Sequence, residues 1–134
     1  MRATCAVAAL SCVLLFVACG TNARRKHIQG PPQQVTDTLN AFQHDLLTRD
    51  WTDLCEQVFS AAARTQAGGG SCPDFVRSGA AGLRGERIRI RSIDVRAGKA
   101  SAAVMTTAEG QAPVAETIDL VLEGGRYRIS ALAR

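Results

Sequence analysis

The sequence predicts an α+β fold in which N-terminal helices pack on a curved, four-stranded antiparallel meander sheet. The prediction rests on a change in the spacing of apolar residues. Before residue 84 they recur at helical spacing, and from residue 87 they alternate as in a strand. Glycine-containing turns then divide the second half into short strands that follow one another in the chain. Helices followed by such a meander favour a sheet covered on one face.

The first 18 residues have the layout of a secretory signal peptide. Residues 1–2 give a short positive start, residues 3–18 carry no charge, and small residues precede Cys19. The apolar run is short for a membrane span, but a permanent N-terminal anchor is the alternative. Residues 15–19, LFVAC, resemble the lipobox of bacterial lipoproteins, in which the cysteine receives a diacylglycerol before cleavage on its N-terminal side. The resemblance implies lipidation of Cys19, and Phe16 departs from the usual leucine.

The cysteine count favours an exported protein with one disulfide bond. The chain has five cysteines, an odd number, and Cys5 and Cys12 would leave with the signal peptide. If Cys19 is lipidated, Cys55 and Cys72 remain, and two cysteines in an oxidising compartment are expected to pair. Neither histidine makes a close-spaced ligand pair with a cysteine, so we expect no metal and no cofactor.

Residues 19–34 form a polar segment that we expect to act as a tether. The segment lacks apolar periodicity, and Gly30-Pro31-Pro32 favours extended backbone. Arg24, Arg25 and Lys26 lie close to the proposed lipid, where they would contact anionic head groups. A solvated linker explains these three residues equally well.

Three helices are expected between residues 35 and 83. The first begins near Val35 and ends at residues 48–50; its apolar stripe is Val35, Leu39, Phe42 and Leu46. The second covers residues 51–63 with Asp50 as its cap, because a short carboxylate accepts the free N–H groups of a first turn. Its buried face is expected to hold Trp51, Leu54, Cys55, Val58 and Phe59. A short third helix starts at Cys72 and is expected to pack through Phe75, Val76 and Leu83.

Four strands are expected from residue 87 onward. In the first, residues 87–95, the apolar side chains switch from even to odd positions after Ile90, and a β-bulge near Arg91-Ser92 would return them to one face. Strands at 100–109, 114–123 and 126–132 follow, and Gly124-Gly125 is typical of a two-residue hairpin turn. The sheet positions expected to face the core are Ile88, Ile90, Ile93, Val95, Val104, Ile118, Leu120, Leu122 and Ile129.

The order of the elements and the segment LLTRDWTDLCEQV at residues 46–58 resemble the nuclear-transport-factor-2-like (cystatin-like, α+β cone) superfamily. Asp50-Trp51 at the helix break, Cys55, Cys72 and the four C-terminal strands carry the resemblance, which covers roughly residues 35–134. It is closest to the small lipoproteins of high-GC Gram-positive bacteria that carry such a domain. The resemblance implies the fold and leaves the function open, because the superfamily hosts enzymes, ligand binders and scaffolds.

Enzymes of this superfamily place an Asp–His or Tyr–Asp group inside the cone. Here His44 lies next to Asp45, but adjacent helical residues do not face each other, and a solvent-facing pair explains them as well. Tyr127 alternates toward the core, where it would act with Asp119 or Asp50, or lie at the rim of the sheet. We therefore expect no catalytic residue.

Arg87, Arg89 and Arg91 form a basic stripe on the first strand, which Arg128 would join from the last. The stripe would contact an anionic surface, or it is simply a solvated outer face. Nucleic acid is not expected as a partner. Of 16 basic and 12 acidic side chains only Arg2 lies in the signal peptide, which leaves a small, scattered excess of 15 over 12.

Two functions remain open at this point. The first is a non-catalytic binding or interaction module, anchored by lipid on the extracytoplasmic face of the cell membrane, with an unknown protein or a small apolar ligand as partner. The second is a small-ligand binder or an isomerase- or dehydratase-like enzyme that uses the cone cavity. The aliphatic inward positions favour a mostly filled cone, with at most a small apolar pocket near Trp51 and Tyr127.

Overall fold

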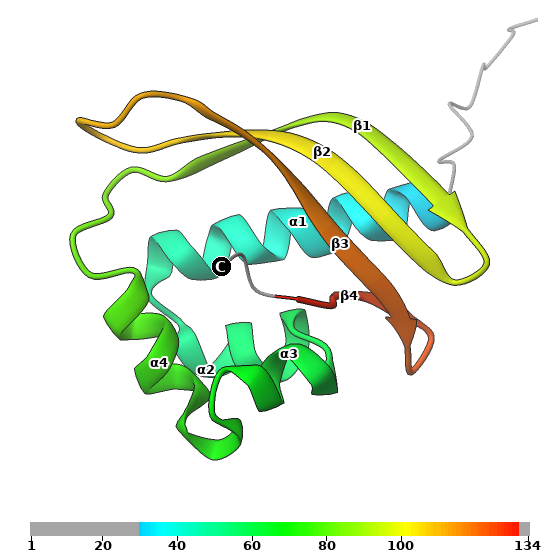
Figure 1. Ribbon diagram of the computed structural model, residues 1–134, viewed down its shortest axis with the longest axis horizontal. Helices are drawn as coiled ribbons and strands as arrows, with labels where there is room; N and C mark the ends of the chain where they lie inside the picture. Colours follow the sequence, from blue (N-terminus) through cyan, green and yellow to red (C-terminus); the bar gives the residue numbers. More distant parts are fainter. Residues whose placement is uncertain (1–29, 132–134) are drawn as a thin grey trace, which may run out of the picture.

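The longest element, helix α1 (Pro31–Thr48), lies across one face of the sheet (Figure 1). The computed structural model describes residues 30–131. Helix α1 begins four residues before the predicted start, because proline is well tolerated in a first helical turn, where a backbone N–H has no partner to lose. Residues 31–34 therefore belong to the helix, and the prediction of extended backbone there is wrong.

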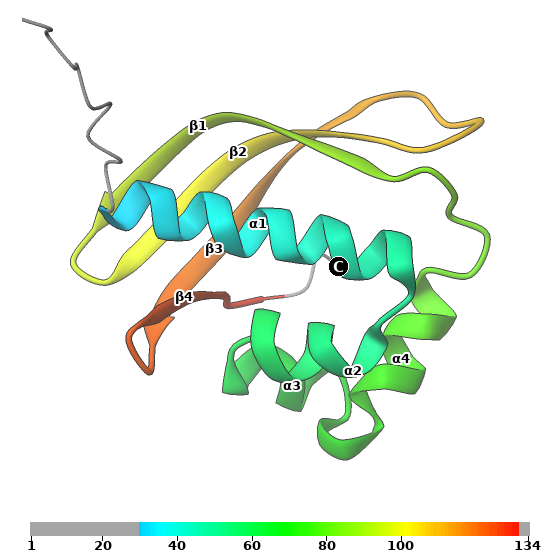
Figure 2. The same ribbon diagram turned by 180° about the vertical axis from the view of Figure 1, so that it is seen from behind.

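A second group of helices follows α1 and turns beneath it, as Figure 2 shows. It consists of α2 (Trp51–Asp53), the π-helical turn η1 (Leu54–Val58), α3 (Ala61–Gln66), the 3-10 turn η2 (Gly69–Ser71) and α4 (Cys72–Gly79). The predicted cap is confirmed, since the Asp53 N–H donates to the Asp50 carboxylate at 3.0 Å. The start of the last helix at Cys72 is confirmed as well.

The predicted single helix over residues 51–63 is interrupted at Phe59. Phe59 has extended backbone and forms a parallel bridge with Ile129 in the last strand. The next residue, Ser60, donates its N–H to the Ile129 carbonyl at 2.9 Å, and its hydroxyl accepts from Ala63 N–H to start α3. Pairing with a distant strand thus overrides local helix propensity at this point.

The sheet is an antiparallel meander in the order β1 (Arg87–Arg96), β2 (Lys99–Thr107), β3 (Val114–Glu123) and β4 (Arg126–Ile129). The register of β1 against β2 shifts between Ile90 and Ser92, which confirms the predicted bulge. The β3–β4 hairpin turns through Gly124 and Gly125, whose φ angles of 61° and 79° suit glycine.

The core lies between the inner face of the sheet and the helices α1, α2 and η1. It is centred on Val35, Leu39, Leu54, Val58, Val104 and Leu120, each at most 2% exposed. The isoleucines of β1 are half-buried against it, as predicted. Leu122 is 46% exposed, against the prediction, because it lies at the end of β3 beside the turn. Phe75, predicted to pack inward, is 55% exposed.

A disulfide bond joins Cys55 in η1 to Cys72 at the start of α4, as predicted. Both cysteines are buried, and their Cα atoms are 6.1 Å apart. The bond ties α4 to the helices that form the core.

Within residues 30–131 no helix is long and apolar enough to cross a membrane. The predicted signal peptide, Cys19, and the basic residues Arg24, Arg25 and Lys26 lie outside the described residues, so those predictions stay predictions.

Candidate functional site

An open apolar groove lies where α1 ends, between that helix, α4 and the sheet. Its volume is about 440 Å³. The apolar walls come from Phe42 and Leu46 of α1, Phe75 and Val76 of α4, Ile88 of β1 and Val114 of β3. We call this cavity the cone groove. Its existence corrects the prediction of a mostly filled cone, because the side chains of the short α4 and of the strand ends do not meet across this space.

A smaller cavity of about 310 Å³ adjoins the cone groove. Phe42, Phe59 and Glu116 line both spaces. The two phenylalanine rings lie 6.4 Å apart between centroids and are tilted by 42°. Ile118 and Ile129 also line the smaller cavity. The combined site is largely apolar, with Glu116 where the two spaces meet and Asp119 in the lining of the smaller one.

Glu116 is an acid on the inner face of the sheet. It pairs with Val104, which is 2% exposed, and it precedes the inward residues Ile118 and Leu120 by two and four positions. Its side chain is half-buried. Glu116 is absent from the predicted inward positions, although the alternation through Ile118 and Leu120 extends back to position 116.

A second carboxylate, that of Glu86, lines the same groove just before β1. Glu86 is only 6% exposed, and its Oε1 atom is buried without a hydrogen-bond partner. The nearest cation is Arg49, whose Nη1 lies 3.8 Å from that oxygen. Arg49 is held in place by the carbonyls of Ala80 and Leu83, to which it donates, and its guanidinium stacks over Trp51 at 5.5 Å.

Trp51 and Tyr127 do not share a pocket, which corrects the prediction that they would. Trp51 is buried beneath Arg49 and borders a shallow space of about 450 Å³ beside the end of α4. Tyr127 is buried and borders a separate space of about 380 Å³ between α1, η1 and β4. The space beside Trp51 shares Ala80 and Leu83 with the lining of the cone groove, whereas the space beside Tyr127 shares no lining residue with it.

Neither of the two acid–base pairs that were considered as alternatives is hydrogen-bonded in the described chain. His44 is exposed, whereas Asp45 is buried, and burial raises the pKa of Asp45 with help from Asp53 and Asp50 and against the opposing effect of His44. Within residues 30–131 no hydrogen bond joins His44 to the Asp45 carboxylate or Tyr127 to an aspartate. In the same part of the chain no three His, Cys, Asp or Glu side chains are grouped to hold a metal ion.

The basic stripe is smaller than predicted. Arg87, Arg89 and Arg91 are exposed on β1, with Arg91 at the bulge where the pairing skips a residue. Arg128 does not join them, because its Nη1 donates to the Glu56 and Gln57 carbonyls at 2.7 and 2.9 Å and so closes the end of η1.

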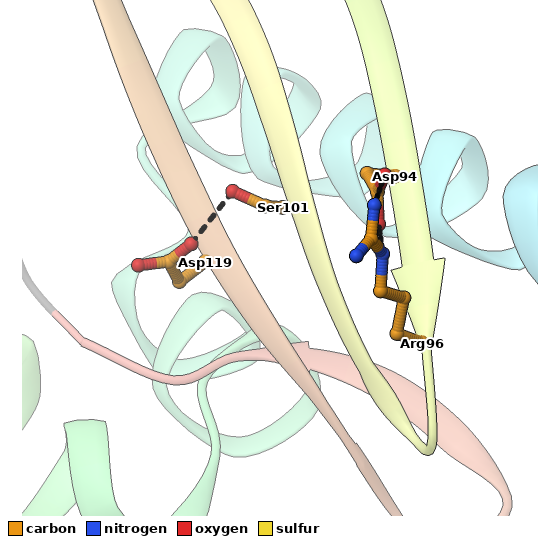
Figure 3. A network of polar contacts seen from close by, with 4 residues as sticks. All are labelled: Asp94, Arg96, Ser101 and Asp119. Atoms are coloured by element: carbon orange, nitrogen blue, oxygen red, sulfur yellow. Dashed lines mark hydrogen bonds and ion pairs between the residues drawn. The ribbon is translucent and has the colours of Figure 1, made fainter.

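A larger but open space of about 720 Å³ lies over the outer face of the sheet. Four of its polar side chains bond in two separate pairs (Figure 3). The Arg96 side chain makes a bidentate contact with Asp94 at 2.8 and 3.0 Å, and the Ser101 hydroxyl donates to Asp119 at 2.9 Å. These charges are already satisfied, so this face offers less to a ligand than the cone groove.

The architecture is an α+β cone, in which a helix-covered meander sheet opens into an apolar groove at one end. This class agrees with the comparison of solved structures. The chain is similar to a protein from Campylobacter jejuni that is named as an NTF2-like transpeptidase, with a TM-score of 0.54, 14% sequence identity, and coverage of 73% of this chain and 98% of that chain. The fold is therefore NTF2-like, as the sequence predicts, and at this identity the likeness extends to the fold alone. No family model and no curated protein matches the chain.

Proposed function

We propose that this protein is a lipoprotein, anchored through Cys19 on the extracytoplasmic face of the cell membrane, whose domain binds a small apolar molecule in the cone groove without converting it. The lipobox resemblance at residues 15–19 supports the anchor. A disulfide between Cys55 and Cys72 suits an oxidising compartment. The observation that carries the binding function is the groove itself, an open apolar cavity with a few polar groups, which is the usual form of a small-molecule site.

The polar groups of the groove favour binding of a ligand without its chemical conversion. Catalysis in such a cone needs a base together with a second group that stabilises the developing charge. Glu116 could serve as a base, and it is the residue that the alternative function, an isomerase- or dehydratase-like enzyme, would use. The second carboxylate, Glu86, would oppose a developing negative charge, so the pair suits binding better than proton abstraction.

A fluorescence titration tests the binding function. The protein is a chain that begins at residue 20 and retains every described element, and the probe is neutral N-phenyl-1-naphthylamine, which brightens in apolar surroundings. We expect saturable binding to the wild-type chain. Phe75→Ala removes an exposed apolar wall of the groove, and losing about half of a phenylalanine's burial, about 1 kcal/mol, should weaken binding about fivefold.

Leu122→Ala is the matched control. Leu122 is exposed to a similar degree, 46% against 55% for Phe75, but it lies outside the groove. Its substitution should leave the probe affinity unchanged. Equal affinities for the wild-type and Phe75→Ala chains, or no saturable binding at all, would contradict the proposed site.

A further inference from the structure

The cone groove combines an apolar wall with negative charge. Two carboxylates line it, Glu86 and Glu116. Glu86 is nine-tenths buried, and its Oε1 atom has no hydrogen-bond partner although Arg49 Nη1 lies 3.8 Å away, so the cost of its desolvation is only partly offset within the described chain. Glu116 is half-buried on the inner face of the sheet, where it pairs with the buried Val104. The negative charges of these two carboxylates favour a cation in the groove.

The aromatic lining points to the same kind of ligand. Of the four phenylalanines in the sequence, the three that fall in the described chain, Phe42, Phe59 and Phe75, all line the cone groove. The faces of aromatic rings carry negative partial charge and attract cations. The phenylalanines and the carboxylates therefore favour positive charge together, whereas an aliphatic lining would favour none.

The basic residues nearby do not cancel this preference. Arg49 approaches Glu86 from the neighbouring space beside Trp51, and its guanidinium already donates to the carbonyls of Ala80 and Leu83. Arg87 lines the rim of the groove and is exposed. Charges at an exposed rim are screened by water and salt, while those within a groove act at lower effective dielectric.

We infer that the cone groove selects amphiphilic amines, molecules that carry a cationic ammonium group on an apolar body. The inference rests on the proposed function. The ammonium group would donate to Glu116, with Glu86 as a second acceptor, while the apolar body packs against the phenylalanines. A neutral alcohol of the same shape would gain the packing without the charge. A carboxylate would meet repulsion from both acids.

A matched series of head groups on one apolar body tests this selection. The ligands are 2-naphthylmethylamine, 2-naphthalenemethanol and 2-naphthoate, titrated at pH 7 into the chain that begins at residue 20 and followed by the amide NMR signals of groove residues. We expect the amine to bind about tenfold more tightly than the alcohol, and the carboxylate to bind more weakly than the alcohol.

Two isosteric variants connect the selection to its residues. Glu116→Gln should reduce the preference for amine over alcohol from about tenfold to about twofold, with little change for the alcohol itself. Glu86→Gln should also reduce the preference for amine over alcohol. The matched control is Glu56→Gln, which removes one negative charge from an exposed position on η1 outside the groove and should leave the preference intact.

The outcomes separate this inference from the proposed function. Three results would overturn the selection for amines. They are equal affinity for all three ligands, tightest binding of the carboxylate, and a preference for the amine that persists in both glutamine variants. In each of these cases N-phenyl-1-naphthylamine would still bind if the groove is a site for apolar molecules. Loss of binding for that neutral probe as well would overturn both proposals.

Discussion

Removal of the Cys55–Cys72 disulfide should destabilise the domain by about 3 kcal/mol. The bond closes a loop between residues 17 positions apart, and in the chain-entropy model a loop of this length restricts the unfolded chain by about that amount. For a domain of this size the melting temperature should fall by about 10–20 °C. The loss should be visible both on reduction of the wild-type chain and in the Cys55→Ala/Cys72→Ala variant.

Urea unfolding, followed by tryptophan fluorescence from the buried Trp51, measures the free energy of unfolding in each state. Reductant added to the double variant serves as the control and should have no effect. Reduction of the disulfide should also affect the groove, because α4 begins at Cys72 and supplies Phe75 and Val76 to the groove wall. The affinity for N-phenyl-1-naphthylamine should therefore drop on reduction. A loss of stability below about 1 kcal/mol would refute the reasoning, since the loop would then hardly be constrained by the bond.

Two further outcomes concern the anchor and a buried acid. Cys19→Ser should abolish both the incorporation of labelled fatty acid and membrane retention in cells, whereas unchanged membrane association would indicate an uncleaved anchor helix instead. Burial raises the pKa of Asp45 above its ordinary value of 3.8, so the folded state binds this proton more tightly than the unfolded state does. The resulting contribution to the free energy of unfolding is fully present below pH 3.8 and is lost as the pH rises through the raised pKa. Asp45→Asn should accordingly gain stability relative to wild type between pH 3 and pH 7 in urea titrations, and a constant difference over that range would show that the carboxyl is not perturbed.

Local sequence signals predicted the features that depend on neighbouring residues. The bulge in β1 followed from the switch of apolar residues from even to odd positions after Ile90, because side chains in a strand alternate strictly between faces. The cap at Asp50 followed from the chemistry of a short carboxylate before a first turn. The cysteine count identified the disulfide once two cysteines were assigned to the signal peptide and one to the lipid.

Features that depend on distant contacts were not accessible in the same way. The helix break at Phe59 arises from a bridge to Ile129, which lies 70 positions later in the chain. The buried Glu86 has its ion-pair partner in Arg49, 37 positions earlier, which in turn is held by carbonyls beyond α4. The cone groove is a space that side chains do not fill. The periodicity of apolar residues shows which side chains face inward, but it does not show whether side chains from opposite walls contact one another. Glu116 is the exception, because its inward position was readable from the pattern of β3.

The direction of α1 separates the two ends of the molecule. Its first turn lies toward the β1–β2 turn and its last turn toward α4 (Figure 1). Phe42 and Leu46, in its last two turns, line the groove. At 1.5 Å per residue the helix places about 20 Å between Pro31 and Leu46. The end of α1 from which the chain leads back toward Cys19 is thus opposite to the end that borders the groove. If the proposed anchor is present, attachment and ligand entry would use opposite ends of the same helix.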